Sequence, residues 1–125
     1  MTRPRPLLSV VDDDESVRES LPDLLHELGY TACAFSSPEE FLASEALDAS
    51  KCLILDIAMP GMSGLDLQSE LKRRGRKIPI IFITGSRNES ARARVLGEGA
   101  AECLYKPFSD IALLTAIHSA LGKPA

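Results

Sequence analysis

The sequence predicts an α/β domain in which a doubly wound sheet of five parallel strands lies between two layers of helices. Five short runs of branched apolar residues, typical of buried strands, alternate with segments of helical periodicity. Such strict alternation favours right-handed crossovers between parallel strands, with helices on both faces of the sheet. The 125 residues suit one domain over 1–125, whose core we expect over about residues 7–121, with short tails at both ends.

The predicted strands are short and strongly apolar. Their ranges are 7–11, 30–35, 52–55, 78–83 and 102–105. Three cysteines, Cys33, Cys52 and Cys103, fall within these ranges and lack the CxxC spacing of a metal or redox site. We therefore expect them to be small, reduced residues of the core.

The first two helices are marked by the residues at their ends. Apolar residues at helical spacing precede Gly29, a residue type favoured after helix C-termini, and Pro22 predicts a kink in this helix. Ser37 and Glu40 have the spacing of a capping box and predict a second helix that extends toward Leu47.

Three further helices are expected in the second half of the chain. One follows Gly64 and ends near Gly75, and a fourth lies around residues 90–96. The fourth contains few sizeable apolar residues, so it should be the least tightly held. The last helix begins at Ser109, and one apolar stripe is predicted to face the core: Ile111, Leu114, Ile117 and Leu121.

The distribution of charge argues against some classes of function. A net charge of −4 and a pI of about 5.2 disfavour a general nucleic-acid-binding surface, which is normally basic. We interpret the basic segment 72–77 as a solvated helix end. Acidic residues stop the apolar run that begins at Leu7 far short of a signal-peptide core, and no run approaches a membrane span. We therefore expect a cytoplasmic protein.

Polar residues follow four of the predicted strands. Asp12 and Asp13 follow the first, and Asp56, Thr84 and Lys106 follow the third, fourth and fifth. Sheets of this kind bind ligands beyond the carboxyl ends of their strands, where the strand order reverses. If the first and third strands are neighbours, several carboxylates converge in one pocket, and their repulsion favours a bound cation. Without His or Cys nearby, an all-oxygen site for Mg²⁺, or Mn²⁺ in its place, is expected.

These groups suit the transfer of a phosphoryl group. A divalent cation and the ammonium group of Lys106 would neutralise the phosphoryl oxygens while a carboxylate attacks phosphorus in line. The product would be an acyl phosphate. His26 and His118 lie on predicted helices away from the strand ends, so we assign them no part in this chemistry.

Four segments together resemble the receiver domain of two-component response regulators, most of all receivers that precede a helix-turn-helix output domain. They are VVDDDESVR (10–18), LILDIAMPGMSG (53–64), IFITGS (81–86) and YKPF (105–108). Each segment alone would be a weak signal. Their order and domain-scale spacing make a specific pattern that covers nearly the whole chain.

The resemblance implies a flavodoxin-like fold with strand order 2-1-3-4-5 and a set of site residues. Asp56 is the implied phosphoacceptor. Asp13 is implied to bind Mg²⁺ directly, together with Asp56 and the backbone carbonyl of Ala58. Asp12 is implied to act on the ion through water.

The resemblance also implies a switch. Thr84 would move to bond a phosphoryl oxygen, Lys106 would pair with the phosphoryl group, and the peptide bond from Lys106 to Pro107 would be cis. Three residues before the lysine, where the family usually carries an aromatic ring that turns inward, this chain has Cys103. Tyr105 lies two residues later, so we expect the signal to travel mainly through the loop after Thr84 and the fourth helix.

Partners follow from the same resemblance. A histidine kinase or phosphotransfer protein would donate the phosphoryl group, a DNA-binding output domain would lie beyond the chain, and phosphorylation would favour a homodimer through the fourth helix, fifth strand and fifth helix. The segment itself is expected to bind neither nucleic acid nor a membrane. It would be a signalling phosphoacceptor that assists its own phosphorylation and dephosphorylation, not an enzyme.

Two other interpretations are open. A small phosphatase with an aspartyl-phosphate intermediate would need a second carboxylate two residues beyond Asp56, where the chain has Ala58. An interaction module that shares the fold but is never phosphorylated would not need the complete set of polar residues. Taken singly, Asp14 and Glu15 are expected to cap the first helix, and the glycines of residues 59–64 would fit a plain loop or let the backbone approach a ligand closely.

Overall fold

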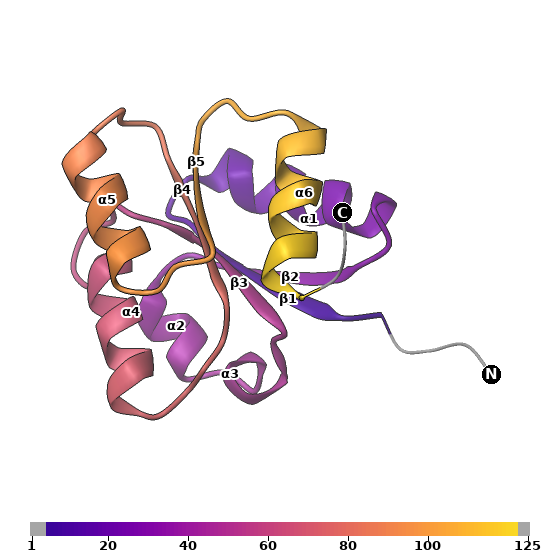
Figure 1. Ribbon diagram of the computed structural model, residues 1–125. Coiled ribbons are helices and arrows are strands. Elements are labelled where there is room, and N and C mark those ends of the chain that lie inside the picture. The colour runs from indigo at the N-terminus through magenta and orange to yellow at the C-terminus, as the bar shows by residue number, and fades with distance from the viewer. Residues whose placement is uncertain (1–4, 123–125) are drawn as a thin grey trace.

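In the computed structural model, which describes residues 5–122, five parallel strands form one sheet in the order β2-β1-β3-β4-β5 (Figure 1). This is the order that the resemblance implied. The strands are β1 (Leu7–Val11), β2 (Thr31–Phe35), β3 (Cys52–Asp56), β4 (Ile80–Thr84) and β5 (Glu102–Tyr105). After β2 the chain crosses to the other side of β1, so the strand order reverses between β1 and β3.

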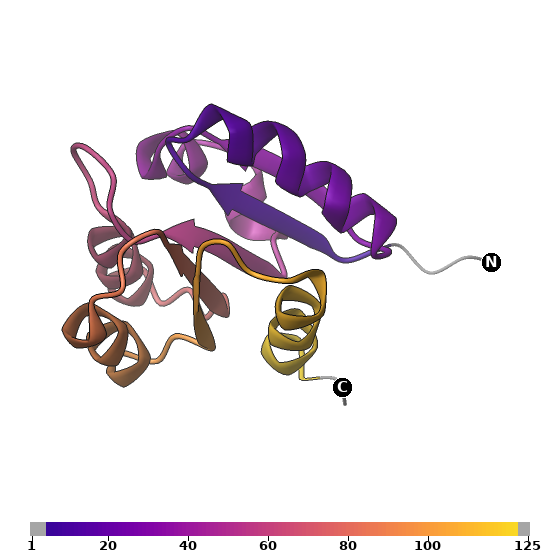
Figure 2. The same cartoon turned by 90° about the horizontal axis from the view of Figure 1, so that it is seen from above.

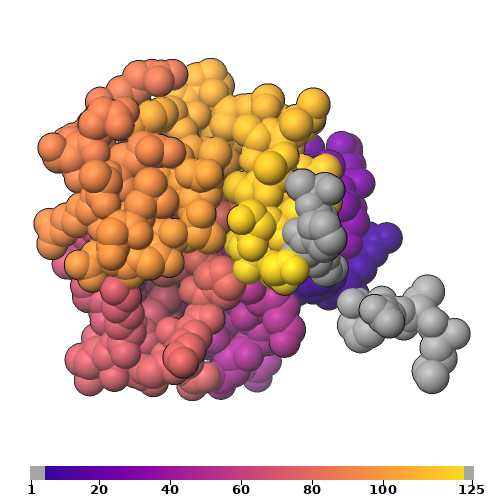
Figure 3. Space-filling model, viewed as in Figure 1, coloured from indigo at the N-terminus to yellow at the C-terminus, as the bar shows by residue number. Residues whose placement is uncertain are grey.

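The helices divide between the two faces of the sheet (Figures 1 and 2). One face is covered by α1 (Glu15–Glu27) and α6 (Asp110–Ala120), and the other by α2 (Pro38–Leu42), α3 (Ala46–Ala49), α4 (Gly64–Arg73) and α5 (Glu89–Gly97). In the space-filling view, α5 and α6 flank the edge strand β5 (Figure 3). The fourth and fifth helices predicted from the sequence are α5 and α6, because the predicted second helix is divided into α2 and α3.

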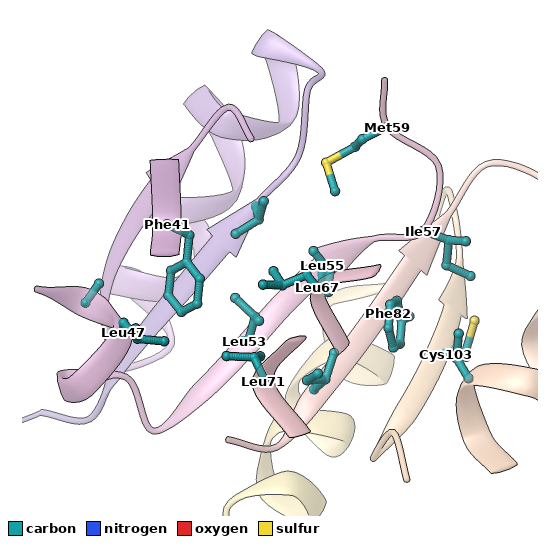
Figure 4. Packing of buried hydrophobic residues seen from close by; sticks show 14 residues of the cluster. Phe41, Leu47, Leu53, Leu55, Ile57, Met59, Leu67, Leu71, Phe82 and Cys103 are labelled. Atoms are coloured by element: carbon teal, nitrogen blue, oxygen red, sulfur yellow. The ribbon is translucent and has the colours of Figure 1, made fainter. Parts of the chain in front are cut away.

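Alternate side chains of the central strands point into two separate hydrophobic cores. Leu53 and Leu55 of β3 pack with Phe82 in the first core, which is closed by α2–α5 and includes Phe41 (Figure 4). Ile54 points the other way, into the second core beneath α1 and α6. Both β3 and β4 are buried along their whole length. This explains why they appear in the sequence as continuous apolar runs.

The break between α2 and α3 corrects the prediction of one longer helix toward Leu47. Ser44 lies at the break, where its hydroxyl donates to the carbonyl of Phe41 at 2.8 Å and accepts from the N–H of Ala46 at 3.2 Å. The side chain thereby takes up backbone groups that a continuous helix would pair internally. By contrast, α1 runs unbroken through Pro22.

The start of β4 also differs from the prediction. The strand begins at Ile80 rather than at residue 78. Pro79 has no N–H to donate to a neighbouring strand, although its carbonyl accepts from the N–H of Leu53 at 2.9 Å. Proline therefore delays the start of the regular pairing.

The apolar stripe predicted for the last helix is wrong at Ile111. This side chain is 77% exposed, whereas the buried residues of α6 are Leu113, Ala116 and Ile117. Six positions separate Ile111 from Ile117, so at about 100° per residue their side chains point about 120° apart around the helix. One narrow face of α6 cannot bury both.

The basic segment 72–77 is exposed as the sequence predicts, whereas the prediction of buried cysteines holds for Cys52 and Cys103 and only partly for Cys33. Most basic residues of the segment 72–77 form ion pairs. Lys72 pairs with Glu98, Arg73 and Arg74 pair with Glu70, and Arg76 pairs with Asp48. The three cysteines are free, two of them buried and one half-buried. Within residues 5–122, no helix is both long and apolar enough to cross a bilayer.

The corrected face of α6 gives a stability prediction. Ile117→Ala should lower the free energy of unfolding by about 2–4 kcal/mol, because it leaves a cavity in the second core. Ile111→Ala should cost less than about 0.5 kcal/mol, because the side chain is already in water. Urea denaturation followed by circular dichroism measures both changes. Equal losses would contradict this assignment of the buried face.

Candidate functional site

Three carboxylates meet where the strand order reverses. Asp12 and Asp13 directly follow β1, and Asp56 is the last residue of β3, which pairs with β1. Each residue offers one oxygen, and these oxygens all lie within 4.8 Å of one another. Asp12 is 0% exposed and Asp56 is 7% exposed, whereas Asp13 faces solvent. The sheet thus brings Asp56 close to two acids that lie more than forty positions earlier in the sequence.

Lys106 adds a cation to this acid cluster, defined as Asp12, Asp13 and Asp56. It follows β5, and its Nζ donates to Oδ2 of Asp12 at 2.9 Å. The backbone N–H of Asp14 donates to the other oxygen of Asp12, also at 2.9 Å. Protein donors therefore hold Asp12 at both of its oxygens. The peptide bond after Lys106 is cis, as the resemblance implied.

Thr84 and Cys103 lie on the two strands beyond the acid cluster. Thr84 ends β4 and is buried, and its Oγ1 accepts from the N–H of Ser86 at 3.1 Å. A local turn therefore occupies its hydroxyl. Cys103 is 3% exposed and lies in the first core, opposite Phe82 in the sheet register (Figure 4). Burial raises the pKa of the Cys103 thiol.

The loop between β3 and α4 closes tightly over the end of β3. Gly64, the first residue of α4, donates its N–H to the carbonyl of Ile57 at 3.0 Å. A Cβ at this position would lie 2.3 Å from the backbone oxygen of Asp56 and 3.1 Å from the ring of Phe82. Glycine is needed here because the chain approaches its own backbone, a requirement that sequence reasoning did not assign to this residue.

Comparison with known proteins shows the family. Residues 8–118 match the model of the response regulator receiver domain. The chain belongs to this family. Its strand order is that of the flavodoxin-like receiver fold, and the domain is part of the two-component signalling machinery, as the four motifs indicated.

Two curated relatives match most of this chain. Nodulation protein W of Bradyrhizobium diazoefficiens is 45% identical over 114 residues, which cover 91% of this chain and 50% of that protein. Response regulator protein TodT of Pseudomonas putida is 42% identical over 115 residues, which cover 92% of this chain and 51% of that protein. The chain thus spans about half the length of the curated relatives that it matches.

Solved structures agree with this assignment. The response regulator StyR superposes with a TM-score of 0.86 at 42% identity, covering 94% of this chain and 60% of StyR. FixJ-N superposes with a TM-score of 0.85 at 31% identity, covering 100% of this chain and 98% of FixJ-N. The chain therefore shares both the fold and much of the sequence of solved receivers.

The acid cluster of the receiver domain is short of positive charge. Burial, reinforced by the charge of Asp12, raises the pKa of Asp56 to about 6, although Lys106 and the backbone N–H of Ala58 act against this rise. Burial opposes the charged form of Lys106, but the hydrogen bond and charge of Asp12 raise its pKa overall. Oxygen donors with excess negative charge fit Mg²⁺ or Mn²⁺.

The loop between β1 and α1 is held by contacts of two kinds. Asp14 caps α1 by accepting from the N–H and hydroxyl of Ser16, which hold the pKa of Asp14 below its usual value. It is therefore a cap, as expected. Arg18, to which sequence analysis assigned no contact, donates from a guanidinium nitrogen to the backbone carbonyl of Asp12 at 3.0 Å. A helix that begins at Glu15 places Arg18 one turn inside the helix, within reach of this loop, and that spacing is the signal that could have identified it.

The raised pKa of Asp56 predicts that its charge destabilises the metal-free domain. Because the pKa rises from 3.8 in the unfolded chain to about 6 on folding, ionisation disfavours the folded state. The penalty is absent below about pH 4, grows as the pH rises to about 6, and is complete above that value. In EDTA at pH 7.5, Asp56→Asn should raise the free energy of unfolding by about 1–3 kcal/mol.

A matched substitution should have the opposite sign. Asp66 is part of the capping box of α4, where hydrogen bonds from Ser63 lower its pKa, so its ionised form favours folding. Asp66→Asn should therefore destabilise the domain at pH 7.5 and still do so at pH 4.5, because the lowered pKa keeps Asp66 ionised at both values. Urea titrations at pH 4.5 and 7.5 measure both variants. A destabilising effect of Asp56→Asn at the higher pH would contradict the electrostatic account.

Proposed function

We propose that this receiver domain accepts a phosphoryl group on the carboxylate of Asp56. The proposal rests on the position of Asp56, which lies at the end of β3 within the acid cluster, close to the cation of Lys106. One carboxylate oxygen would attack phosphorus in line and form the new O–P bond. The bond from phosphorus to the donor atom would break, and its electron pair would leave with the donor. The product is an acyl phosphate.

The same acids supply the proposed metal site. Asp13 and Asp56 would hold Mg²⁺, or Mn²⁺, directly together with the backbone carbonyl of Ala58, and Asp12 would act through water. The spacing of the carboxylate oxygens and the raised pKa of Asp56 support this arrangement. When bound, the cation neutralises charge on the carboxylates and on the phosphoryl oxygens.

Lys106 and Thr84 complete the proposed machinery. The Nζ of Lys106 would bond a phosphoryl oxygen as a mobile point charge while it stays close to Asp12. The hydroxyl of Thr84 would bond another oxygen, and to do so it would have to give up the N–H of Ser86. The loop between β4 and α5 would then move. Since Cys103 has no ring to turn inward, this loop would carry the signal to the surface.

The proposed donor is a histidine kinase or a histidine-containing phosphotransfer protein. A groove of about 280 Å³ lies beside Lys106 and is walled by Val17, Leu21 and Leu24 of α1 and by Phe108. Its apolar lining, which Lys106 joins to the proposed site, suits a helix of the donor. The domain would serve as a phosphoacceptor that promotes its own phosphorylation and dephosphorylation, and not as an enzyme with an external substrate.

In the intact protein we propose a DNA-binding output domain. The FixJ protein of Azorhizobium caulinodans, 40% identical over 117 residues, is a transcriptional regulatory protein, which supports control of transcription as the output. Phosphorylated domains would pair through α5, β5 and α6, where the exposed Ile111 offers an apolar contact. We place the protein in the cytoplasm, where its free cysteines would stay reduced.

Mass spectrometry tests the central proposal. Incubation with acetyl phosphate and Mg²⁺ should add one phosphoryl group to the intact wild-type domain, and Asp56→Asn should abolish the addition. EDTA should suppress it in the wild type. An unmodified wild type would favour the interaction module that is never phosphorylated, and modification of the Asn variant to the same extent would assign the chemistry to another residue.

A further inference from the structure

Tyr105 joins the two residues that flank the start of α5. Its hydroxyl donates to the carboxylate of Glu89, the first residue of α5, at 2.7 Å. The guanidinium carbon of Arg87 lies 4.8 Å from the centre of the Tyr105 ring, a cation–π distance. We call Arg87, Glu89 and Tyr105 the Tyr105 clamp. It ties the loop before α5 to the edge strand β5.

Tyr105, the residue of the clamp that belongs to β5, lies beside Thr84 in the sheet. Thr84 and Tyr105 are partners in the register of β4 and β5, and the N–H of Lys106 donates to the carbonyl of Thr84 at 2.8 Å. The backbone at this point is therefore fixed by the sheet. Ser86, whose N–H is bonded to the hydroxyl of Thr84, directly precedes Arg87. A movement of the Thr84 hydroxyl away from Ser86 therefore acts on the loop that carries Arg87.

Other contacts hold α5 further along its length. Arg92 contacts Glu102 of β5 at 3.3 Å, and the side chain of Gln68 donates to the carbonyl of Val95 at 3.2 Å. Val95 is fully buried in the first core. These contacts anchor the middle and end of the helix, whereas the Tyr105 clamp holds its first turn and the preceding loop.

The position of Tyr105 at the end of β5 explains how its side chain can reach the start of α5. Cys103 and Tyr105 are two residues apart in a regular strand, so their side chains lie on the same face. Cys103 is sealed in the first core, but Tyr105 is only half-buried and reaches the start of α5. Arg87 over its ring and Glu89 at its hydroxyl thus hold Tyr105 at the surface.

We propose that the Tyr105 clamp holds the loop between β4 and α5 in the unphosphorylated position, and that Tyr105 is the positioning residue that opposes the movement of Thr84. The proposal rests on the function proposed for Asp56 and Thr84. Phosphorylation would draw the Thr84 hydroxyl away from Ser86, displace Arg87 from the ring and release the first turn of α5. The clamp would thereby set how readily a phosphoryl group is accommodated.

Thermodynamic linkage turns this proposal into a measurable affinity. An interaction made only in the unphosphorylated state must be broken when a phosphoryl mimic binds, so its removal tightens binding. An interaction made equally in both states changes stability and leaves the affinity unaltered. The sign of the change separates a switch from a structural contact.

The experiment uses beryllofluoride with Mg²⁺, titrated calorimetrically into the wild-type chain. Tyr105→Phe removes the bond to Glu89, and Arg87→Gln removes the cation over the ring. Each variant should bind beryllofluoride about two- to tenfold more tightly, the range expected from losing one hydrogen bond or one exposed cation–π contact. Without ligand, Tyr105→Phe should also speed amide exchange over residues 85–91.

Two controls make the outcome specific. Arg94→Gln removes the same charge from α5 outside the clamp, and its affinity should match the wild type. Asp56→Asn should not bind the mimic. An unchanged or weaker affinity of the Tyr105→Phe and Arg87→Gln variants overturns the clamp while leaving the proposed function intact. A wild type that does not bind beryllofluoride overturns the proposed function itself, and the clamp with it.

Discussion

The mutual repulsion of three carboxylates at one edge of the sheet is the constraint around which this receiver domain is organised. The topology creates it: once β3 lies beside β1, Asp56 must lie close to the two acids that follow β1. Lys106 relieves part of the repulsion by its contact with Asp12, yet burial, reinforced by the charge of Asp12, still raises the pKa of Asp56 to about 6. The metal-free fold therefore holds an electrostatic cost that a divalent cation would remove.

The rest of the structure keeps the acids in place against that repulsion. β3 and β4 are buried along their whole length. The end of β3 therefore cannot move away from β1 without exposing apolar residues to water. Gly64 lets the loop between β3 and α4 pack closely against the backbone of Asp56. Arg18 ties the backbone of Asp12 to α1. Packing and backbone contacts position the site, together with the two donors that hold the oxygens of Asp12.

The two ends of the proposed signal are held in different ways. Asp56 lies in a rigid strand, whereas Thr84 is followed by a loop whose bonds are few and polar. The first turn of α5 depends on Arg87, Tyr105 and Glu89 at the surface. Polar surface contacts of this kind contribute little energy each, so the proposed phosphorylation of Asp56 would need only a small free-energy change to shift them.

Sequence patterns predicted the sheet and the acid cluster because both depend on local signals. Apolar runs mark buried strands, and acids that follow two of them must meet if those strands are neighbours. The positions that were misjudged or left unassigned depend on geometry that a linear pattern does not contain. Ser44 divides a helix through its own hydroxyl, Ile111 faces away from the core by its angle on α6, and Gly64 is needed only because Asp56 lies above it.

The measurement that tests this account most directly is a calorimetric titration of Mg²⁺ into the wild type, Asp13→Asn and Asp14→Asn. The two variants remove the same charge at neighbouring positions, but only Asp13 belongs to the acid cluster, and Asn can keep the helix cap at position 14. We expect one ion per wild-type domain, an affinity at least about tenfold lower for Asp13→Asn, and a nearly unchanged affinity for Asp14→Asn. No binding by the wild type, or equal losses in both variants, would contradict the account.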